Sequence, residues 1–326
     1  MFGRFETKRL IFHKTANISV LCHMYKKKER ESYRAMTNGY YHFCTDGLSG
    51  DVIFHNEAEY AFGMILMGLV SLKFSIRIYA FCLMPNHLHI ILNGTGANCL
   101  LAFDYLKRKL SARLKKDGYA PLPEEYWFKL TRIETKEQMK QEIIYVMRNP
   151  LEKRLSIVGC YLWSSEWLYY SSLPELLDAP PLPSLSKRAQ KALIGGEEDI
   201  PGHWRFHPYI GLLPNYFVDT SMVHKLFPDP KDLQIAIVKD FEVFFQIANR
   251  LGELASFNKF EIESIVSNTL QKRFACKELS ELSDDEKGKL AIILNRELGL
   301  NSYQISTSIY MKEKAVRQLL ASKELR

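Results

Sequence analysis

The first half of the chain alternates between strand-like and helix-like patterns of apolar residues. Strand-like runs cover Tyr40–Thr45, Phe74–Met84, His87–Leu92 and Lys129–Glu134. Helical periodicity covers Glu57–Val70, Leu100–Lys116 and Lys136–Arg148. The last of these helices is expected to end near Asn149, because a proline disfavours helical backbone in the residue before it. The order β-α-β-β-α-β-α predicts an α+β domain with a ferredoxin-like antiparallel sheet covered by helices.

The second half of the chain has a different pattern. Four prolines between residues 174 and 186 indicate a domain boundary, and residues 200–220 are loop-like. From residue 230 to the end the pattern is almost entirely helical, which predicts a mostly α-helical C-terminal domain. The predicted organisation is therefore a basic arm at 1–37, a sheet domain at 38–173, a proline-rich irregular linker at 174–229 and a helical domain at 230–326.

Composition and charge limit the class of protein. No apolar run approaches the roughly 20 residues that span a bilayer, and the start lacks the apolar core of a secretory signal, so we expect no membrane partner. The six cysteines have no CxxC spacing, which favours reduced thiols in a cytoplasmic protein. Residues 1–170 contain 24 Lys and Arg against 16 Asp and Glu, a net of +8, so the remainder carries −1 of the total +7. This distribution favours a polyanionic partner such as nucleic acid.

A pair of histidines gives the sheet domain its first candidate chemistry. His87 and His89 stand two residues apart in a strand-like run, so their side chains leave the same face of the sheet. Leu88 and Ile90 then point to the opposite, buried face. Paired imidazoles on one strand suit a divalent metal. A single histidine in a strand is more often a structural residue, but a pair is harder to explain in that way.

The helix that ends the sheet domain carries two further polar residues. Tyr145 and Asn149 are four residues apart and therefore share one helical face. Asn149 can supply a hard oxygen ligand, which together with the histidines suits Mg²⁺ or Mn²⁺. Such an ion polarises a phosphodiester, and the phenol of Tyr145 can attack it to form a covalent phosphotyrosine.

Two motifs of this chain resemble those of a known superfamily. Phe81–Leu92, with His87-Leu88-His89, is similar to the HUH motif of single-strand DNA transposases, and Tyr145–Pro150 is similar to their tyrosine motif, in its REP-associated form. Tyr40–Phe43, Ile53–His55 and Trp163–Ser165 resemble further stretches of that branch, over about 40% of the chain. The family commonly has Arg-Gly after the first strand, where this chain has Asp46-Gly47.

The resemblance implies a role for each motif residue. His87, His89 and Asn149 would be metal ligands, and Tyr145 the nucleophile. The implied partner is single-stranded DNA with a hairpin formed by a palindromic repeat. The implied products are a 5′-phosphotyrosine and a free 3′-OH, and transfer of this link to another DNA end gives DNA transposition. A homodimer in which Tyr145 serves the partner's histidines and a monomer both remain open.

Basic residues supply candidate DNA contacts. They lie in one helix, around the tyrosine motif and near the C-terminus: Lys107, Arg108, Arg113, Arg148, Lys153, Arg154, Lys312, Lys314 and Arg317. The C-terminal three belong to a predicted helix-turn-helix within 284–322, in which Ser283 and Glu286 form a capping box ahead of the first helix. A solvated helix face and a plain helical packing module are the structural alternatives. The rival functional interpretation is a non-catalytic, sequence-specific DNA-binding regulator that retains the transposase fold.

Overall fold

The structure is a computed structural model, and it describes residues 26–326 except 49–50, 170–179, 182–183, 197, 208, 240, 252–258, 299 and 322–326. Most of the predicted basic arm and the first part of the proline-rich segment therefore lie outside the described residues. Residues 26–35 form a helix that buries Tyr33 against the sheet domain. Among the described residues, no helix combines the length and the apolar content of a membrane span.

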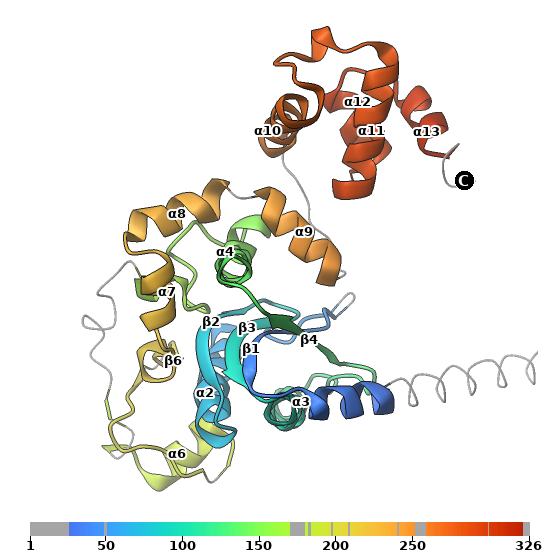
Figure 1. The fold of residues 1–326 in the computed structure, drawn as a ribbon. Coiled ribbons are helices and arrows are strands. Elements are labelled where there is room, and N and C mark those ends of the chain that lie inside the picture. Colours follow the sequence, from blue (N-terminus) through green and yellow to red (C-terminus); the bar gives the residue numbers. More distant parts are fainter. Residues whose placement is uncertain are drawn as a thin grey trace, which may run out of the picture.

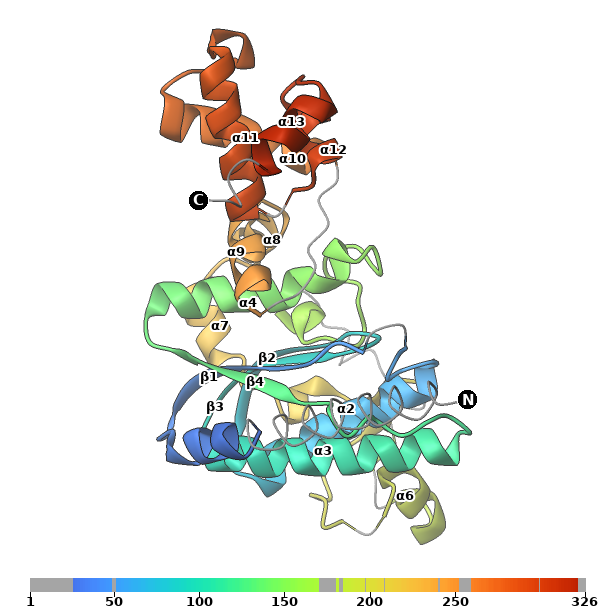
Figure 2. The same cartoon turned by 90° about the vertical axis from the view of Figure 1, so that its right-hand side faces the viewer.

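Four antiparallel strands form the central sheet in the order β2-β3-β1-β4. They are β1 (Gly39–Thr45), β2 (Arg77–Leu83), β3 (Leu88–Gly94) and β4 (Phe128–Ile133). Helices α2 (Glu57–Lys73) and α3 (Gly96–Lys116) cover one face, and α4 (Lys136–Glu152) covers the other (Figures 1 and 2). The predicted α+β class and the predicted element order are both found. His87 lies one residue before β3 rather than inside it.

The two faces of the sheet differ in composition. Phe43 points toward α2 and α3, where it stacks on Phe128 at 4.6 Å between ring centroids, and Phe103 of α3 stacks on Phe128 at 4.7 Å. His42, the neighbour of Phe43 in β1, points the opposite way because alternate residues of a strand face opposite sides. His42 is fully buried beneath α4. Helices therefore cover both faces of the sheet. The sheet presents aromatic rings toward α2 and α3, and the histidine side chains toward α4.

The sequence predicts the start of helix α4 at Lys136 correctly, but not its end. Its start is a capping box, in which Thr135 accepts from the Gln138 amide and the Gln138 side chain accepts from the Thr135 amide. The predicted end near Asn149 is wrong, because α4 continues through Pro150 to Glu152. A proline removes one backbone donor. Pro150 is buried, and packing of this last turn offsets the lost hydrogen bond.

The first hydrophobic core extends well beyond residue 173. It includes side chains up to Leu251, from the segments α6 (Lys187–Ile194), β5 (Phe206–His207), β6 (Gly211–Leu212), a 3-10 turn at Pro214–Tyr216, α7 (Ser221–Leu226), α8 (Pro230–Lys239) and α9 (Phe241–Leu251). Gly211 shows how closely β6 approaches α2: its φ is +77°, and a Cβ there would lie 2.2 Å from the carbonyl oxygen of Ala61. The boundary predicted from the prolines is therefore not where the hydrophobic cores divide.

The segment after α4 closes the sheet at its β2 edge. Leu83 N donates to Trp163 O at 2.8 Å, and Ser165 N donates to Phe81 O at 3.0 Å. Ser165 Oγ also accepts from Phe81 N at 3.0 Å. A 3-10 turn, η1 (Glu166–Tyr169), follows this pairing. The stretch beginning at Trp163 thus satisfies edge backbone groups that would otherwise be open to another strand.

A second, separate core lies in the C-terminal unit. It is built from α10 (Lys259–Thr269), a π-helical turn at Leu270–Phe274, a 3-10 turn at Leu279–Glu281, α11 (Asp284–Leu298), α12 (Ser302–Ser308) and α13 (Glu313–Ala321). Ser283 and Glu286 form the capping box predicted for α11. Ile305, Ile309 and Val316 are buried in this core. The arrangement of α11, α12 and α13 is that of a compact helical module (Figure 1).

Candidate functional site

Two histidines from neighbouring strands lie side by side under α4. His89 of β3 pairs with Cys44 of β1, so His89 and His42 project from the same face. Their ring nitrogens, His42 Nε2 and His89 Nδ1, are 3.0 Å apart. Both side chains are fully buried. Burial lowers the pKa of His89 well below its ordinary value, and the nearby His42 and Lys153 act in the same direction.

A buried carboxylate extends this pair. Glu142, three residues before Tyr145 on α4, places Oε2 at 2.8 Å from His42 Nδ1. Arg250 of α9 donates to the other oxygen, Oε1, at 2.5 Å. Burial opposes ionisation of Glu142, but its hydrogen bonds with His42 and Arg250, together with the charge of Arg250, outweigh burial and lower the pKa of Glu142. Glu142, His42 and His89 therefore form one continuous polar chain from helix to sheet.

His87 is held by its preceding residue. The ring of His87 lies edge-on to that of His89, with centroids 4.8 Å apart. His87 Nδ1 is 2.7 Å from Asn86 Oδ1. Asn86 in turn donates its amide to Leu48 O at 3.1 Å, which fixes the orientation of that amide. The two predicted histidine ligands are thus adjacent.

Helix α4 brings Tyr145 to the histidines and carries Asn149 one turn later. The ring of Tyr145 lies 5.4 Å from that of His89 and 5.7 Å from that of His42. Asn149 follows one helical turn later and donates its amide to Tyr145 O at 3.0 Å. Its oxygen, Oδ1, is buried and accepts no hydrogen bond from any described residue. The structure therefore brings Tyr145 to the histidines, and it leaves Asn149 with a buried oxygen that can accept.

The candidate ligands supply atoms of the kinds that bind a small divalent cation. Within the described ranges, no group of three or more His, Cys, Asp or Glu side chains is arranged to hold a metal. The candidate set instead combines the imidazoles of His87 and His89 with the amide oxygen of Asn149. Nitrogen and hard oxygen donors suit Mg²⁺ or Mn²⁺ with positions left for phosphate and water. The buried Oδ1 of Asn149 is the observation that favours this set.

Helices α8 and α9 cover the tyrosine. Tyr145 is fully buried, and Phe244 of α9 stacks on its ring at 4.6 Å. Arg148 passes between α4 and α8, where it donates to Ile237 O at 2.6 Å and Val238 O at 2.9 Å. Figure 1 shows both helices lying over α4. In this conformation the phenol of Tyr145 is closed to a DNA strand.

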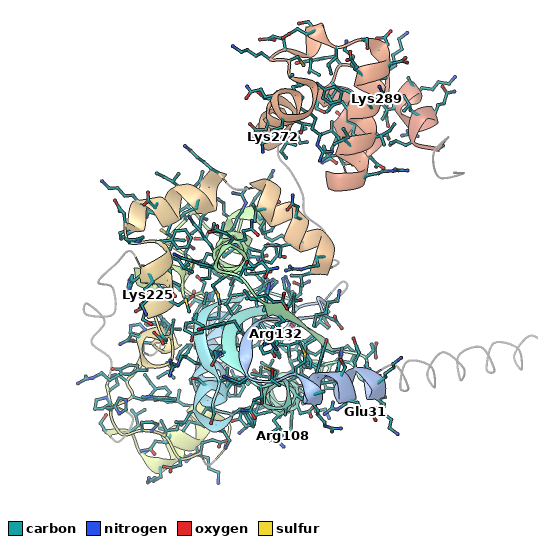
Figure 3. All side chains as sticks on the ribbon, viewed as in Figure 1. Glu31, Arg108, Arg132, Lys225, Lys272 and Lys289 are labelled. Carbon is teal, nitrogen blue, oxygen red and sulfur yellow. The ribbon has the colours of Figure 1, made fainter. Side chains whose placement is uncertain are left out.

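The predicted DNA contacts divide into three groups. On α3, Arg108 is exposed on the outer side of the helix (Figure 3), Lys107 donates to Glu124 O and Tyr126 O, and Arg113 is paired with Asp117. Because α3 covers the face opposite α4, these three residues do not join the tyrosine site. Contact between them and DNA stays a prediction.

Around α4 the three predicted basic residues have different surroundings. Arg148 is 1% exposed and bound to carbonyl groups of α8, so it cannot meet a phosphate while α8 is in place. Lys153 is half-buried and close enough to His89 to influence its pKa. Arg154 is exposed and adopts a left-handed backbone, with φ 55°. Lys153 and Arg154 are thus the members of this group that reach solvent.

The three predicted basic residues of the C-terminal unit lie at or on α13. Lys312, Lys314 and Arg317 are exposed at or on α13. Arg317 forms an ion pair with Glu313, one turn earlier in the same helix, at 2.7 Å. Their exposure leaves the predicted DNA contact open to test.

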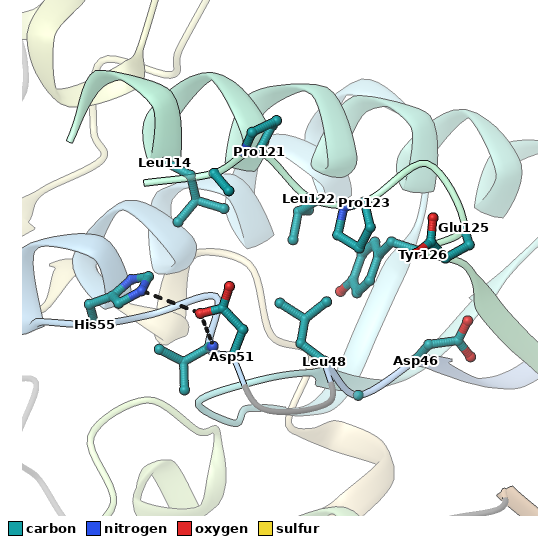
Figure 4. A pocket seen from close by; sticks show the side chains of 13 residues that line it. Asp46, Leu48, Asp51, His55, Leu114, Pro121, Leu122, Pro123, Glu125 and Tyr126 are labelled. Carbon is teal, nitrogen blue, oxygen red and sulfur yellow. Dashed lines mark hydrogen bonds and ion pairs between the residues drawn. The ribbon is translucent and has the colours of Figure 1, made fainter. Parts of the chain in front are cut away.

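A separate pocket of about 450 Å³ lies between the β1–α2 connection and the α3–β4 loop (Figure 4). Asp46, Asp51 and Glu125 give it an acidic lining. His55 lies in its wall, stacked on Tyr119 at 3.6 Å and bonded to Glu59 at 3.0 Å. Acidic side chains repel a phosphate backbone. The Asp46-Gly47 turn therefore belongs to a surface that disfavours DNA.

Sequence reasoning missed the residues that support the histidines and cover the tyrosine. His42 lies in the predicted first strand, and its side chain leaves the same face of the sheet as that of His89. Glu142 shares a helical face with Tyr145 and Asn149. Each of these two residues therefore carried a local signal. Phe244 and Arg250 carried none. Their positions depend on α9 folding back onto α4 from about 100 residues along the chain.

Comparison with known proteins gives a limited likeness. No family model matches the chain, and no curated protein matches it. Among solved structures, the chain is similar to a REP-associated tyrosine transposase bound to a REP hairpin, at 15% identity. That likeness covers 40% of this chain and 79% of the other, with a TM-score of 0.33.

Proposed function

We propose that this protein cleaves and rejoins single-stranded DNA through a covalent link to Tyr145, as a metal-dependent tyrosine transposase or DNA nickase–ligase. The observation that carries the proposal is the single buried cluster formed by His87, His89 and Tyr145, with Asn149 one helical turn beyond. The motifs that resemble HUH transposases lie far apart in the sequence. Their side chains nevertheless meet between the sheet and α4.

Each side chain has a distinct part in this reaction. His87, His89 and Asn149 would hold Mg²⁺ or Mn²⁺, which supplies Lewis-acid polarisation of a bound phosphodiester. The Tyr145 phenol loses its proton, its oxygen bonds to phosphorus, and the bond from phosphorus to the 3′ oxygen breaks. That oxygen takes up a proton and leaves as a free 3′-OH, while the 5′ phosphate stays on Tyr145. The reverse reaction joins the phosphate to another 3′ end.

The element order and strand order support the ferredoxin-like arrangement on which this proposal is built. A β-α-β-β-α-β order with the first strand and the third side by side at the centre is that of a split βαβ sheet. In this arrangement β1 and β3 occupy the middle of the sheet. The middle is where the histidines can be covered fully by one helix.

Access to Tyr145 requires a change of conformation. The phenol is covered by Phe244 and the Arg148 contacts to α8 hold the cover in place. A DNA strand can therefore reach Tyr145 only after α9 has moved away from α4. Movement of α8 and α9 would also release Arg148 and free its guanidinium for phosphate contact.

We further propose that the C-terminal unit selects the DNA site. In a helix-turn-helix, the second helix enters the major groove and its N-terminal residues meet the base edges. Lys312, Lys314 and Arg317 are exposed at the start of α13. A palindromic hairpin offers a duplex stem for this unit and single strands for the tyrosine site.

A covalent-adduct assay tests the proposal. The full-length protein is incubated with hairpin-bearing single-stranded oligonucleotides, labelled at the 3′ end, in Mg²⁺ or Mn²⁺. We expect a labelled protein band that survives denaturant and is absent in Tyr145→Phe. A matched control, Tyr119→Phe, removes an exposed phenol outside the cluster and should leave the band intact.

The same assay decides against the rival. Tight binding to hairpin DNA with no adduct on any hairpin substrate, in either metal, would contradict cleavage and support a non-catalytic DNA-binding regulator. An adduct that persists in Tyr145→Phe would contradict the assigned nucleophile.

A further inference from the structure

Behind each of the two candidate histidine ligands lies a buried hydrogen-bond chain. One runs from Glu142 through His42 to His89, and the other runs from Leu48 through Asn86 to His87. We propose that these chains fix the proton of both ligands on Nδ1. His42, Glu142 and Asn86 are then positioning residues that make both imidazoles present an Nε2 lone pair. The purpose of this arrangement rests on the proposed function, but its existence can be tested without DNA.

The order of protons in the first chain begins at the carboxylate. Ionised Glu142 can only accept, so His42 Nδ1 carries a proton and donates it across the 2.8 Å contact. A neutral His42 then has its lone pair on Nε2. His89 Nδ1, at 3.0 Å, must supply the proton for that second contact. The lone pair of His89 is therefore on Nε2.

The two contacts of His42 need one proton each. A single proton on each ring satisfies both, with His42 Nδ1 donating to Glu142 and His89 Nδ1 donating to His42 Nε2. A second proton on His42 would reverse its contact with His89 and move the His89 proton to Nε2, which is the outcome that a tautomer measurement distinguishes.

The second chain reaches the same outcome through an amide. Because Asn86 Nδ2 donates to Leu48 O at 3.1 Å, its oxygen must face His87. An amide oxygen only accepts, so His87 Nδ1 carries the proton in the 2.7 Å contact. The lone pair of His87 is then on Nε2. Both rings also lose rotational freedom, because Nδ1 of each is held.

This arrangement prepares a metal site before the metal arrives. Support behind metal-ligating histidines fixes both tautomer and ring orientation, and its loss typically costs 10–100-fold in metal affinity. Here the support comes from β1, α4 and the turn before β3. It also reaches α9 through Arg250, so the helix that covers Tyr145 contacts the same chain.

Nitrogen-detected tautomers test the inference directly. Full-length protein labelled with ¹⁵N on histidine, free of metal and DNA, is observed by long-range ¹H–¹⁵N correlation, with signals assigned from single His→Gln variants. We expect protonated Nδ1 and unprotonated Nε2 for both His87 and His89. A proton on His89 Nε2 in the unmodified protein would overturn the inference.

Two variants measure the effect on a metal, with Mn²⁺ alone as the probe in calorimetry. His42→Phe keeps the ring but removes both nitrogens, and should move the His89 proton to Nε2 and weaken Mn²⁺ binding by about 10–100-fold. Glu142→Gln keeps the shape and one oxygen, so a smaller loss is expected, and it serves as the test if His42→Phe fails to fold. His55→Phe, outside both chains, should change neither measurement. Unchanged His89 tautomer and Mn²⁺ affinity in both variants would overturn the inference.

The readouts separate this inference from the proposed function. The expected tautomers without any covalent adduct would contradict DNA cleavage and leave the hydrogen-bond chains standing. An adduct that depends on Tyr145, in a protein whose His89 carries its proton on Nε2, would contradict the chains alone.

Discussion

The two faces of the central sheet are both buried, but they are built for different tasks. Toward α2 and α3 the sheet presents aromatic rings, with Phe43 and Phe103 both stacked on Phe128. Toward α4 it presents His42 and His89. Burying polar groups costs free energy unless hydrogen bonds compensate, whereas burying aromatic rings stabilises the fold. The difference indicates that the first face contributes mainly to stability, whereas the second holds the polar side chains on which the proposed reaction depends.

The polar face shows how its cost is offset. Glu142 is bonded by both His42 and Arg250, and Arg148 is bonded to two carbonyl groups of α8. Asn149 Oδ1 is buried and accepts no hydrogen bond from any described residue. Buried groups whose pKa is shifted by burial and by specific charged partners concentrate at functional sites. Substitutions on either face of the sheet can test this contrast.

The largest expected effect is on the polar face. Tyr145→Phe should remove covalent adduct formation entirely, because no other atom of the ring can attack phosphorus. The same change removes one buried hydroxyl, whose effect on the free energy of unfolding is about 1 kcal/mol. Adduct yield and urea unfolding of the same preparations check this. A loss of several kcal/mol with retained adduct would reverse the roles assigned to the two faces.

The next effect belongs to the aromatic face. Phe43→Ala should lower the free energy of unfolding by about 3–5 kcal/mol, because it leaves a cavity beneath Phe128 and α3. Adduct formation per folded molecule should be retained, since Phe43 points away from Tyr145. Denaturant unfolding followed by adduct assays in native buffer measures both quantities. Abolished adduct in a preparation shown to be fully folded would contradict the separation of the faces.

Glu166 is a buried carboxyl that lies on neither face of the sheet, and its pKa shifts in the opposite direction to that of Glu142. Burial raises the pKa of Glu166 to about 7, even though it accepts from Gly159 N at 2.8 Å, whereas hydrogen bonds lower that of Glu142. A raised pKa in the folded state means that Glu166 favours folding most below its unfolded pKa of 4.5, and this contribution is lost as pH rises through 7. The loss is about 3 kcal/mol between those limits.

Thermal unfolding across pH 5 to 8 checks this, with Glu166→Gln as the variant. Glutamine keeps the oxygen that accepts from Gly159 but does not titrate. The stability of the variant should exceed that of the parent at pH 8, and the gap should close toward pH 5. Parallel profiles for both proteins would contradict a raised pKa.

The smallest expected effect concerns the cover over the polar face. Phe244→Ala removes the ring stacked on Tyr145 and should speed adduct formation by several-fold, because α9 then leaves α4 more easily. Stability should fall at the same time. Val243→Ala, a partly buried neighbour, is the matched control and should not speed the reaction. A slower reaction in Phe244→Ala would show that the stacked ring assists Tyr145 rather than covering it.

The sequence predicts this molecule best where its signals are local. Strand alternation placed β1, β3 and β4, helical periodicity placed α3 and α11, and the spacing of Tyr145 and Asn149 put both on one face of α4. The capping box at Ser283 was also readable, because its contacts span three residues. His87 and His89 were readable as a pair for the same reason.

What the sequence could not predict depends on long-range packing. The extent of α4 past Pro150 follows from the burial of its last turn, not from local propensity. The division of the cores at Leu251 rather than at the prolines follows from α8 and α9 folding back over α4. Arg148, predicted from its charge to meet phosphate, is instead held at the end of α8.

The most direct test of the central claim is to identify the residue that carries the DNA. The full-length protein would react with a hairpin oligonucleotide in Mn²⁺, and nuclease and protease digestion followed by mass spectrometry would locate the attached 5′ nucleotide. We predict it on Tyr145, in a peptide that also contains Arg148 or ends there. A nucleotide on any other tyrosine, or no modified peptide after demonstrated cleavage of the strand, would contradict the account.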